Sequence, residues 1–240
     1  MGLGISMGLG IKKSSKLGSD GWSPLDEASL VTWYKSGVGV TGTTAVTQWD
    51  DQSSNNNHLT NTTGANEAAF NSAENSLTMV ADDIMNTTSQ IALPSFTIGF
   101  VVDPSESPID ANLILGDGDT NKNAIWIYNN TALRFRYGGT GAAGATKGIG
   151  LNAGNDFLDK CYVILERDVE NTWLWFNGVR QNASTNSSGS LDLLIDKIGD
   201  IAWVGAGNSY KGEFYEIVIF SAYDSSGDLI ANLNSRLASV

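Results

Sequence analysis

The chain has 240 residues, a formal net charge of −12 and 41% hydrophobic residues, which is enough apolar surface for a core of ordinary size. Nucleic acid and anionic membranes are excluded as expected partners, because a strongly acidic surface repels them. One cysteine and one histidine exclude an internal disulfide, a Cys₂His₂ zinc site and a histidine-rich metal site. We expect a single domain over residues 21–240, preceded by an arm over residues 1–20.

The arm is glycine-rich and apolar, with the sequence MGLGI occurring twice. Glycine interrupts every apolar run, so the segment is neither a stable helix nor long enough to span a bilayer. Lysines follow the apolar part, which is the reverse of a secretory signal, so we expect synthesis in a reducing cytoplasm. Three interpretations of residues 1–20 stay open: a disordered start, a cloning remnant, or an arm that becomes ordered on a neighbouring subunit. The side chains available for such docking are Met1, Leu3, Ile5, Met7, Leu9 and Ile11.

Strands are indicated in the middle of the chain by alternation of apolar and polar residues with a period of two. The first expected strand is Ser95–Asp103, with Phe96, Ile98 and Phe100 on one face. The stretch NAIWIYNNTALRFRYGG follows and predicts a hairpin, since Asn129-Asn130 tolerates the positive φ of a turn. Its return strand has one apolar face and one basic face.

A second hairpin is expected from CYVILERDVENTWLWFNGVRQ, with its turn near Asp168–Asn171. Trp173 and Trp175 then lie on one side of its second strand, which ends at the turn dipeptide Asn177-Gly178. Between the hairpins, Gly138–Gly150 is glycine-rich without the ending of a phosphate loop, and we expect a mobile surface loop there.

The last part of the chain predicts two strands, around Ala202–Gly205 and Glu213–Phe220, and then a helix. The helix is indicated by leucines that recur every four residues near the end, with Ile230 beside them. The fold class predicted is all-β: two antiparallel sheets packed face to face, with a short C-terminal helix.

Several stretches carry a family resemblance when they are taken in order. They are SPLDEASLVTWYKSGVGV, VTQWDDQSSNNNHLT, TWLWFNGVR and YKGEFYEIVIFSAYDSSGDLIANLNSRL. Over residues 23–238 they resemble the concanavalin A-like lectin/glucanase (laminin G/pentraxin-like) jelly-roll superfamily, as found in bacteriophage structural proteins. The recurrent Trp-Asp-Ser-Asn pattern of that superfamily falls on Trp49, Asp51, Ser53 and Asn57. The resemblance implies a jelly roll, but lectins, adhesive modules, glycosidases and virion proteins all share it.

Ligand-contact candidates come from aromatic residues that lie near polar groups. We name Trp126 and Tyr128 on the first hairpin, and Trp49 and Asp51 in the Trp-Asp pattern. The pattern also has a structural interpretation, which we favour. Asp51 and Ser53 can hydrogen-bond their own backbone and shape a tight loop.

A catalytic function is an alternative with named residues, because glycosidases of this superfamily carry an E-x-D-x-E motif on a strand. ERDVE supplies Glu166, Asp168 and Glu170. The apolar alternation stops at Leu165 and RDVEN then predicts the turn of the hairpin, so we interpret the three carboxylates as part of a solvated turn and expect no enzyme activity. The alternative is a glycoside hydrolase that uses Glu166 and Glu170.

Calcium is the cofactor that the sequence allows, although none is required. LGDGDTNKN places Asp117, Asp119 and Asn121 at alternate positions, and their oxygens are ligands that Ca²⁺ prefers. The EF-hand pattern is absent, because its glycine and glutamate positions hold Lys122 and Tyr128. A plain hairpin loop is the competing interpretation.

Taken together, these features resemble those of bacteriophage structural proteins. The resemblance implies a non-catalytic virion protein, made in the host cytoplasm and placed in the head decoration, a fibre or the tail. Its arm would dock on other virion proteins or on sister subunits, and its body would display a lectin-like domain to cell-surface glycans. A stand-alone carbohydrate-binding module is the alternative.

Overall fold

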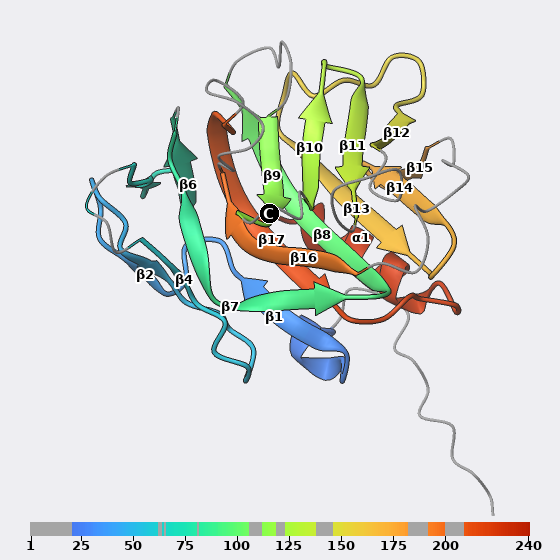
Figure 1. Ribbon diagram of the computed structural model, residues 1–240, viewed down its shortest axis with the longest axis horizontal. Helices are drawn as coiled ribbons and strands as arrows, with labels where there is room; N and C mark the ends of the chain where they lie inside the picture. Colours follow the sequence, from blue (N-terminus) through green and yellow to red (C-terminus); the bar gives the residue numbers. More distant parts are fainter. Residues whose placement is uncertain are drawn as a thin grey trace, which may run out of the picture.

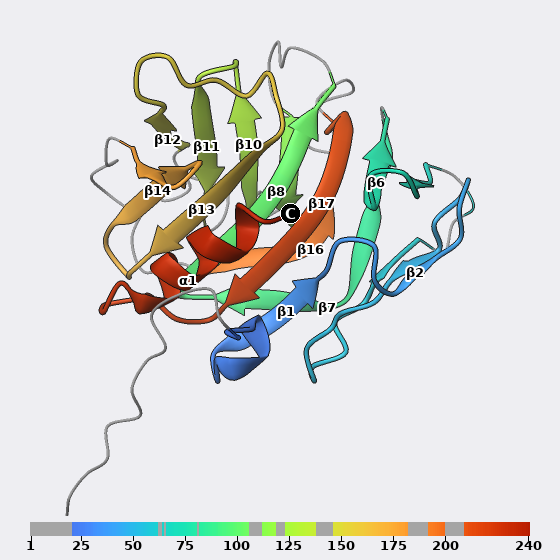
Figure 2. The ribbon, with the colours of Figure 1, turned by 180° about the vertical axis from the view of Figure 1, so that it is seen from behind.

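The computed structural model describes residues 21–61, 64, 66–80, 82–105, 112–118, 123–137, 146–181, 192–199 and 209–240. In these parts, two antiparallel sheets face each other, and one short helix covers the outer side of one sheet (Figures 1 and 2). The predicted two-sheet sandwich with a C-terminal helix is therefore confirmed. The arm and the strand expected around Ala202–Gly205 lie outside the described residues.

Sheet A has the order β15-β14-β13-β8-β17-β6-β5, with β1 also pairing with β17. Its strands are β1 (Leu30–Tyr34), β5 (Ala69–Asn71), β6 (Ser76–Met79), β8 (Phe96–Pro104), β13 (Cys161–Arg167), β14 (Thr172–Phe176), β15 (Val179–Arg180) and β17 (Gly212–Phe220). A short 3₁₀ helix, η1 (Pro24–Asp26), precedes β1.

Sheet B has the order β12-β11-β10-β9-β16-β7-β4-β3-β2. Its strands are β2 (Val40–Thr41), β3 (Gln48–Trp49), β4 (Leu59–Thr60), β7 (Met85–Leu93), β9 (Asn112–Gly116), β10 (Ala124–Tyr128), β11 (Ala132–Arg136), β12 (Lys147–Gly150) and β16 (Leu193–Ile198).

The main core lies between the two sheets, where alternate residues of each strand point inward. Phe96, Ile98 and Phe100 of β8 all belong to it, as the sequence predicts. Cys161 of β13 also lies in this core, where burial raises the pKa of its thiol and keeps it protonated. The largest fully buried side chains include Trp49, Tyr34, Tyr137, Tyr210 and several phenylalanines.

A second apolar layer lies on the outer face of sheet A, beneath helix α1 (Asp228–Leu237), which crosses β13, β8 and β17 in Figure 2. Leu229, Ile230, Leu233 and Leu237 bury the predicted helical stripe against this sheet. Gly99 of β8 permits the close approach, because a Cβ there would lie 2.8 Å from Leu237 Cδ1. In the described part of the chain, no helix is long and apolar enough to cross a membrane.

Both predicted hairpins are confirmed. Strands β10 and β11 pair around Asn129, which adopts a φ of 51°. Strands β13 and β14 pair around a turn in which Asp168 Oδ1 accepts hydrogen bonds from the backbone N–H groups of Glu170 and Asn171. Asn177 and Gly178 both have positive φ and form the tight turn into β15.

The expected loop over Gly138–Gly150 needs a correction, because its last residues form strand β12 at the edge of sheet B. Ile149 points into the core while Gly148 and Gly150 point outward, so the strand has a single apolar side chain. A period of two cannot be recognised from one such residue, and this explains why the glycine-rich sequence suggests a loop.

Candidate functional site

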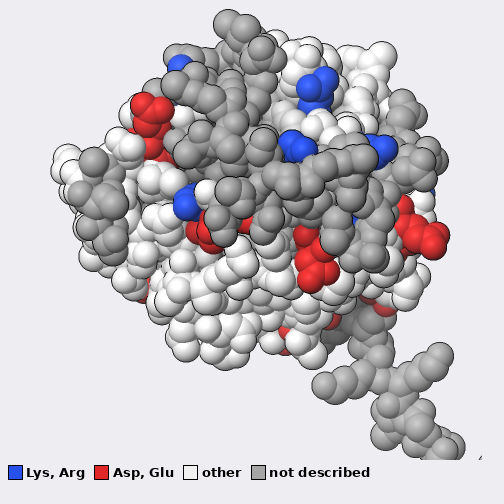
Figure 3. All heavy atoms as spheres, in the orientation of Figure 1, with Lys and Arg blue, Asp and Glu red and all other residues white. Residues whose placement is uncertain are grey.

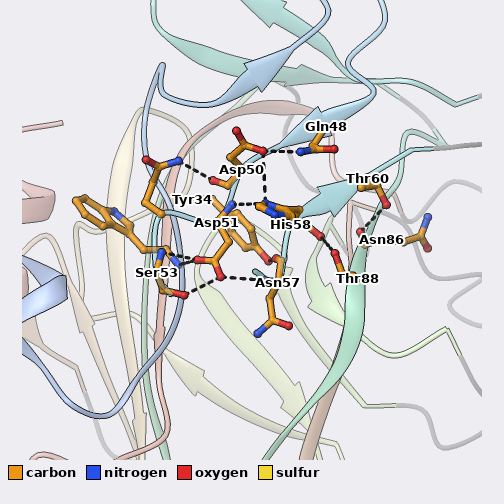
Figure 4. Close-up of polar contacts among 12 residues, drawn as sticks. Tyr34, Gln48, Asp50, Asp51, Ser53, Asn57, His58, Thr60, Asn86 and Thr88 are labelled. Carbon is orange, nitrogen blue, oxygen red and sulfur yellow. Dashed lines mark hydrogen bonds and ion pairs between the residues drawn. The ribbon is translucent and has the colours of Figure 1, made fainter. Parts of the chain in front are cut away.

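The Trp-Asp pattern forms a self-contained loop around Asp51 (Figure 4). Its Oδ1 accepts hydrogen bonds from the backbone N–H groups of Trp33 and Ser53, both at 2.9 Å. Its Oδ2 accepts from Ser53 Oγ at 2.7 Å and from the Asn57 N–H at 3.0 Å. Burial opposes ionisation of Asp51, but these bonds outweigh it and lower the pKa. Both oxygens are thus engaged in holding the loop to β1.

The neighbours of Asp51 complete this loop without offering a ligand surface. Trp49 is 1% exposed and packs against Tyr34, with 5.7 Å between ring centroids. His58 Nδ1 accepts a hydrogen bond from the Asp51 N–H at 3.2 Å. Of the two interpretations of this pattern, the geometry favours the structural one, so we do not propose Trp49 or Asp51 as ligand contacts.

The calcium candidates are described only in part. Asp117 is fully buried, and its backbone N–H donates to the Asn123 carbonyl at 3.0 Å. Asp119 and Asn121 lie outside the described residues. Within the described ranges, no group of three His, Cys, Asp or Glu side chains is placed to hold a metal ion. A calcium site here stays a prediction from the sequence.

Trp126 and Tyr128 lie on the outer face of sheet B, on the side opposite α1. Trp126 is 7% exposed and packs with Leu113 and Ala124. Tyr128 is half-buried, and the Arg134 guanidinium lies 3.1 Å from the centroid of its ring. Tyr128 borders a hollow at the surface.

The three carboxylates of ERDVE do not share one environment. Glu166 belongs to strand β13 and is 3% exposed, Asp168 caps the following turn, and Glu170 is exposed on that turn. The predicted turn is correct for Asp168 and Glu170. It is wrong for Glu166, because β13 continues past Leu165 and pairs Glu166 with Trp173 and Thr97.

Glu166 opens onto a hollow of about 460 Å³ on the outer face of sheet A. Figure 2 shows the region, where the end of β13 lies beside the start of α1. Strands β13, β14 and β15 contribute one side of the hollow, and the segment between β17 and α1 contributes the other. The side chains and backbone that line it belong to Glu166, Trp173, Trp175, Arg180, Tyr223, Asp224, Ser225, Ser226, Gly227 and Ile230.

Aromatic rings form one wall of this hollow. Trp173 and Tyr223 are stacked, with 5.2 Å between centroids and an interplanar angle of 28°. The Arg180 guanidinium lies 6.0 Å from the Trp173 ring and 5.8 Å from the Trp175 ring. Trp173 and Trp175 are half-buried, while Arg180 and Tyr223 are exposed. The wall therefore combines apolar ring surface with hydrogen-bond donors at its rim.

Glu166 supplies the buried polar group of the hollow. Its Oε1 accepts a hydrogen bond from the Asp224 N–H at 2.8 Å, and its Oε2 has no partner among the described residues. Burial raises its pKa to about 7, and the charges of Asp224 and Asp168 add to that effect. The hydrogen bond from Asp224 and the charge of Arg180 act in the opposite direction. Near neutral pH, Glu166 can thus either donate a proton to a ligand hydrogen bond or accept one.

The opposite wall is held in place by the Asp224 carboxylate. Its Oδ1 accepts from the backbone N–H groups of Ser226 and Gly227, and its Oδ2 accepts from that of Ile230 at 2.8 Å. These bonds anchor the first turn of α1, where the N-cap residue Gly227 has no side chain to do so. The wall is therefore defined before any ligand arrives.

We expect Glu166→Gln to make the protein more stable at pH 8 and to leave stability nearly unchanged at pH 4. The folded pKa of Glu166 lies above its ordinary value of 4.5, so the folded state binds more protons between these values. Stability therefore falls as pH rises from about 4.5 to 7, by on the order of 1–3 kcal/mol, and glutamine removes that loss. Urea unfolding at both pH values measures this effect.

Glu170→Gln is the matched control, since Glu170 is exposed on the turn. We expect it to change stability by less than about 0.5 kcal/mol at either pH. Equal stability of Glu166→Gln and the parent at pH 8 would contradict a raised pKa at Glu166.

The sequence identifies some residues of this site but does not show that they lie together. Trp173, Trp175 and Glu166 are visible in the second hairpin as residues on one side of their strands. Tyr223 and Asp224 come from the distant end of β17, and no local pattern connects them to the hairpin. Arg180 follows the Asn177-Gly178 turn, which returns it beside Trp175. That turn is the sequence feature from which Arg180 could have been predicted as a residue of this site.

No protein-family model and no curated protein sequence matches the chain. Similar solved structures include domain 4 of AbnA, a GH43 extracellular arabinanase from Geobacillus stearothermophilus, in complex with arabinotriose. It is 15% identical with a TM-score of 0.60, over 88% of this chain and 99% of that one. Trypanosoma rangeli sialidase has 15% identity and a TM-score of 0.59, over 88% of this chain and 33% of the sialidase. At these identities the likeness establishes the β-sandwich fold alone.

Proposed function

We propose that this protein is a non-catalytic carbohydrate-binding module, and that its glycan site is the hollow between β13, β14 and the start of α1. The observation that carries the proposal is the stacked Trp173–Tyr223 pair beside Glu166, a buried carboxyl with one oxygen that no described residue hydrogen-bonds. Apolar ring faces beside a few placed polar groups are the usual composition of a small-ligand site. The hollow of about 460 Å³ also falls within the usual size range.

Carbohydrate is the ligand class that suits this chemistry. A sugar ring has apolar C–H faces that pack on aromatic surface, and hydroxyl groups that both donate and accept hydrogen bonds. Arg180 can donate, and Glu166 can do either according to its protonation state. The fold is shared with an arabinanase domain solved with arabinotriose, so neutral oligosaccharides are the first class to test.

The positions of the carboxylates support binding of a glycan without its hydrolysis. Most glycosidases hydrolyse their substrate with two carboxyl groups that flank the scissile bond. Glu166 lies in the hollow, but Glu170 is exposed on the turn beyond the end of β13 and does not line it. Asp224 does line it, but its carboxylate oxygens accept bonds from the α1 backbone.

A role in a virion is a second, finer proposal. It rests on the doubled MGLGI arm, which would dock on a particle or on sister subunits and leave the glycan hollow facing outward. Residues 1–20 lie outside the described part of the chain, so sequence alone supports it.

We expect Trp173→Ala to weaken binding of a neutral oligosaccharide at least tenfold, or about 1.4 kcal/mol. Trp173 belongs neither to the main core between the sheets nor to the apolar layer beneath α1, so its removal takes away ring surface from the hollow with little effect on packing. The measurement is calorimetric titration with arabinotriose, cellotriose and galactotriose. Tyr128→Ala on the opposite sheet is the control and should bind as the parent does. Unaltered affinity in Trp173→Ala, or no binding of any of the three sugars, would overturn the proposal.

A further inference from the structure

A second hollow, of about 490 Å³, lies on the outer face of sheet B. It is lined by Tyr128, Asn129, Ala132, Arg134, Thr146, Lys147, Gly148 and Gly150. Pairing places Ala132 opposite Gly150 and Arg134 opposite Gly148, while Ile149 and Leu133 between them point into the core. The floor of the hollow is therefore formed by glycine and alanine residues, and the Arg134 side chain lies beside it.

The Arg134 guanidinium carbon Cζ lies over the Tyr128 ring, 3.1 Å from the ring centroid. Stacking uses the face of the guanidinium and leaves its N–H donors free in the plane. Among the described residues, Arg134 makes no hydrogen bond or ion pair that would occupy these donors. Among the described residues its fork of donors therefore stays available, and such a fork can bind carboxylate or sulfate groups in bidentate fashion.

The charge around this hollow contrasts with that of the whole chain. The protein carries a net charge of −12, yet the charged residues that line this hollow are Arg134 and Lys147. Lys147, like Arg134, has no carboxylate within ion-pair distance in the described part of the chain. Figure 3 shows Lys and Arg side chains on the upper part of this face, over the strands labelled β10 to β12 in Figure 1.

We propose that this hollow is a second ligand site, selective for an acidic saccharide whose carboxylate or sulfate is bound by Arg134. The glycine and alanine floor gives room for the sugar ring beside the anion. The site is separate from the hollow beside α1: it lies on the other sheet, has no carboxylate in its lining and favours charged over neutral sugars. It requires none of the residues proposed for the neutral-glycan site.

Titration with trigalacturonate at low salt tests the proposal, with galactotriose as the neutral comparison. The backbone N–H signals of Gly148 and Gly150 in nitrogen-15 spectra report contact at the floor. We expect Arg134→Gln to weaken trigalacturonate binding at least tenfold. Arg134→Lys should fall between that variant and the parent, because an ammonium lacks the planar fork. Trp173→Ala should leave trigalacturonate binding unchanged, so failure at one hollow is distinguishable from failure at the other.

Gly150→Val separates binding from folding. A Cβ at Gly150 meets no atom within 4 Å, and valine suits a strand, so the urea midpoint should stay the same or rise. The added methyl groups occupy the hollow, so we expect affinity for trigalacturonate to fall at least fivefold. Full affinity in this variant or in Arg134→Gln would overturn the site. Displacement of trigalacturonate by equimolar inorganic sulfate would overturn the saccharide assignment, as would no shift of the glycine signals.

Discussion

Arg236→Ala is expected to lower the free energy of unfolding by about 3–5 kcal/mol, the usual cost of leaving a buried charge without its partner. The partner is Glu216 of β17, whose side chain is fully buried. Arg236 of α1 donates from Nε to Glu216 Oε1 at 2.9 Å and from a terminal nitrogen to Oε2 at 2.6 Å. Trp33 Nε1 donates to Oε1 at 3.0 Å and is the one other donor to this carboxylate among the residues that the structure describes. Urea unfolding at pH 7 measures the loss.

Two further variants separate charge from packing. Arg236→Lys keeps a positive charge but loses the two-pronged geometry, so we expect a smaller loss of about 1–2 kcal/mol. Glu216→Gln added to Arg236→Ala should recover part of the stability, because a neutral amide is cheaper to bury and can still accept from Trp33. If Arg236→Ala costs less than about 1 kcal/mol, the pair behaves as an exposed ion pair and this account is wrong.

The same ion pair connects helix packing to the proposed glycan site. Arg236 lies in the last turn of α1, and the first turn of that helix forms a wall of the hollow through Gly227 and Ile230. Loosening α1 at one end should therefore also weaken sugar binding at the other. Glu216 reaches Arg236 from a β-bulge in β17, where the register shifts between Phe214 and Glu216.

Local patterns account for the elements that could be predicted from the sequence. The hairpin around Asn129-Asn130 and the one around Asp168–Asn171 are both present, because each combines period-two alternation with turn residues that favour one geometry. The closing helix is present for the same reason, as its leucines bury one stripe. Short strands such as β2, β3 and β4 offer two residues each, too few for any period to appear.

The candidate site could be predicted only in fragments, because it is made by long-range pairing. Trp173 and Trp175 alternate with core residues, but alternation does not show what lies over their outer face. Helix α1 and Tyr223 come to that face because β17 runs beside β8 and returns the chain there. Glu166 illustrates the same limit. Its sequence context resembles a solvated turn, and the cover supplied by Asp224 makes it a buried acid.

Asp51→Ala is the other substitution for which we expect a large effect, a loss of about 3–4 kcal/mol of unfolding free energy. The carboxylate accepts four hydrogen bonds, from the Trp33, Ser53 and Asn57 backbones and from Ser53 Oγ. Removing it leaves one buried donor, the Trp33 N–H, and three partly buried donors unpaired, and a buried unpaired group costs about 1–3 kcal/mol. Asp50→Asn is the neighbouring control; its carboxylate is 38% exposed, so we expect less than about 1 kcal/mol. Urea midpoints of the three proteins at pH 7 provide the comparison.

The pH dependence of Asp51→Asn identifies the charge as the cause. Asparagine keeps the shape and an acceptor for the Trp33 and Ser53 N–H groups, but its amide nitrogen replaces the oxygen that accepts from Asn57. The folded pKa of Asp51 lies below the ordinary value of 3.8, so its stabilising contribution is present above that pH. It is lost as pH falls through the folded pKa, where the parent becomes neutral like the variant. The stability gap between parent and variant should therefore be widest above pH 4 and narrow below it. A gap that is the same at pH 7 and in acid would mean that Asp51 acts through shape alone, and the ionised loop would be excluded.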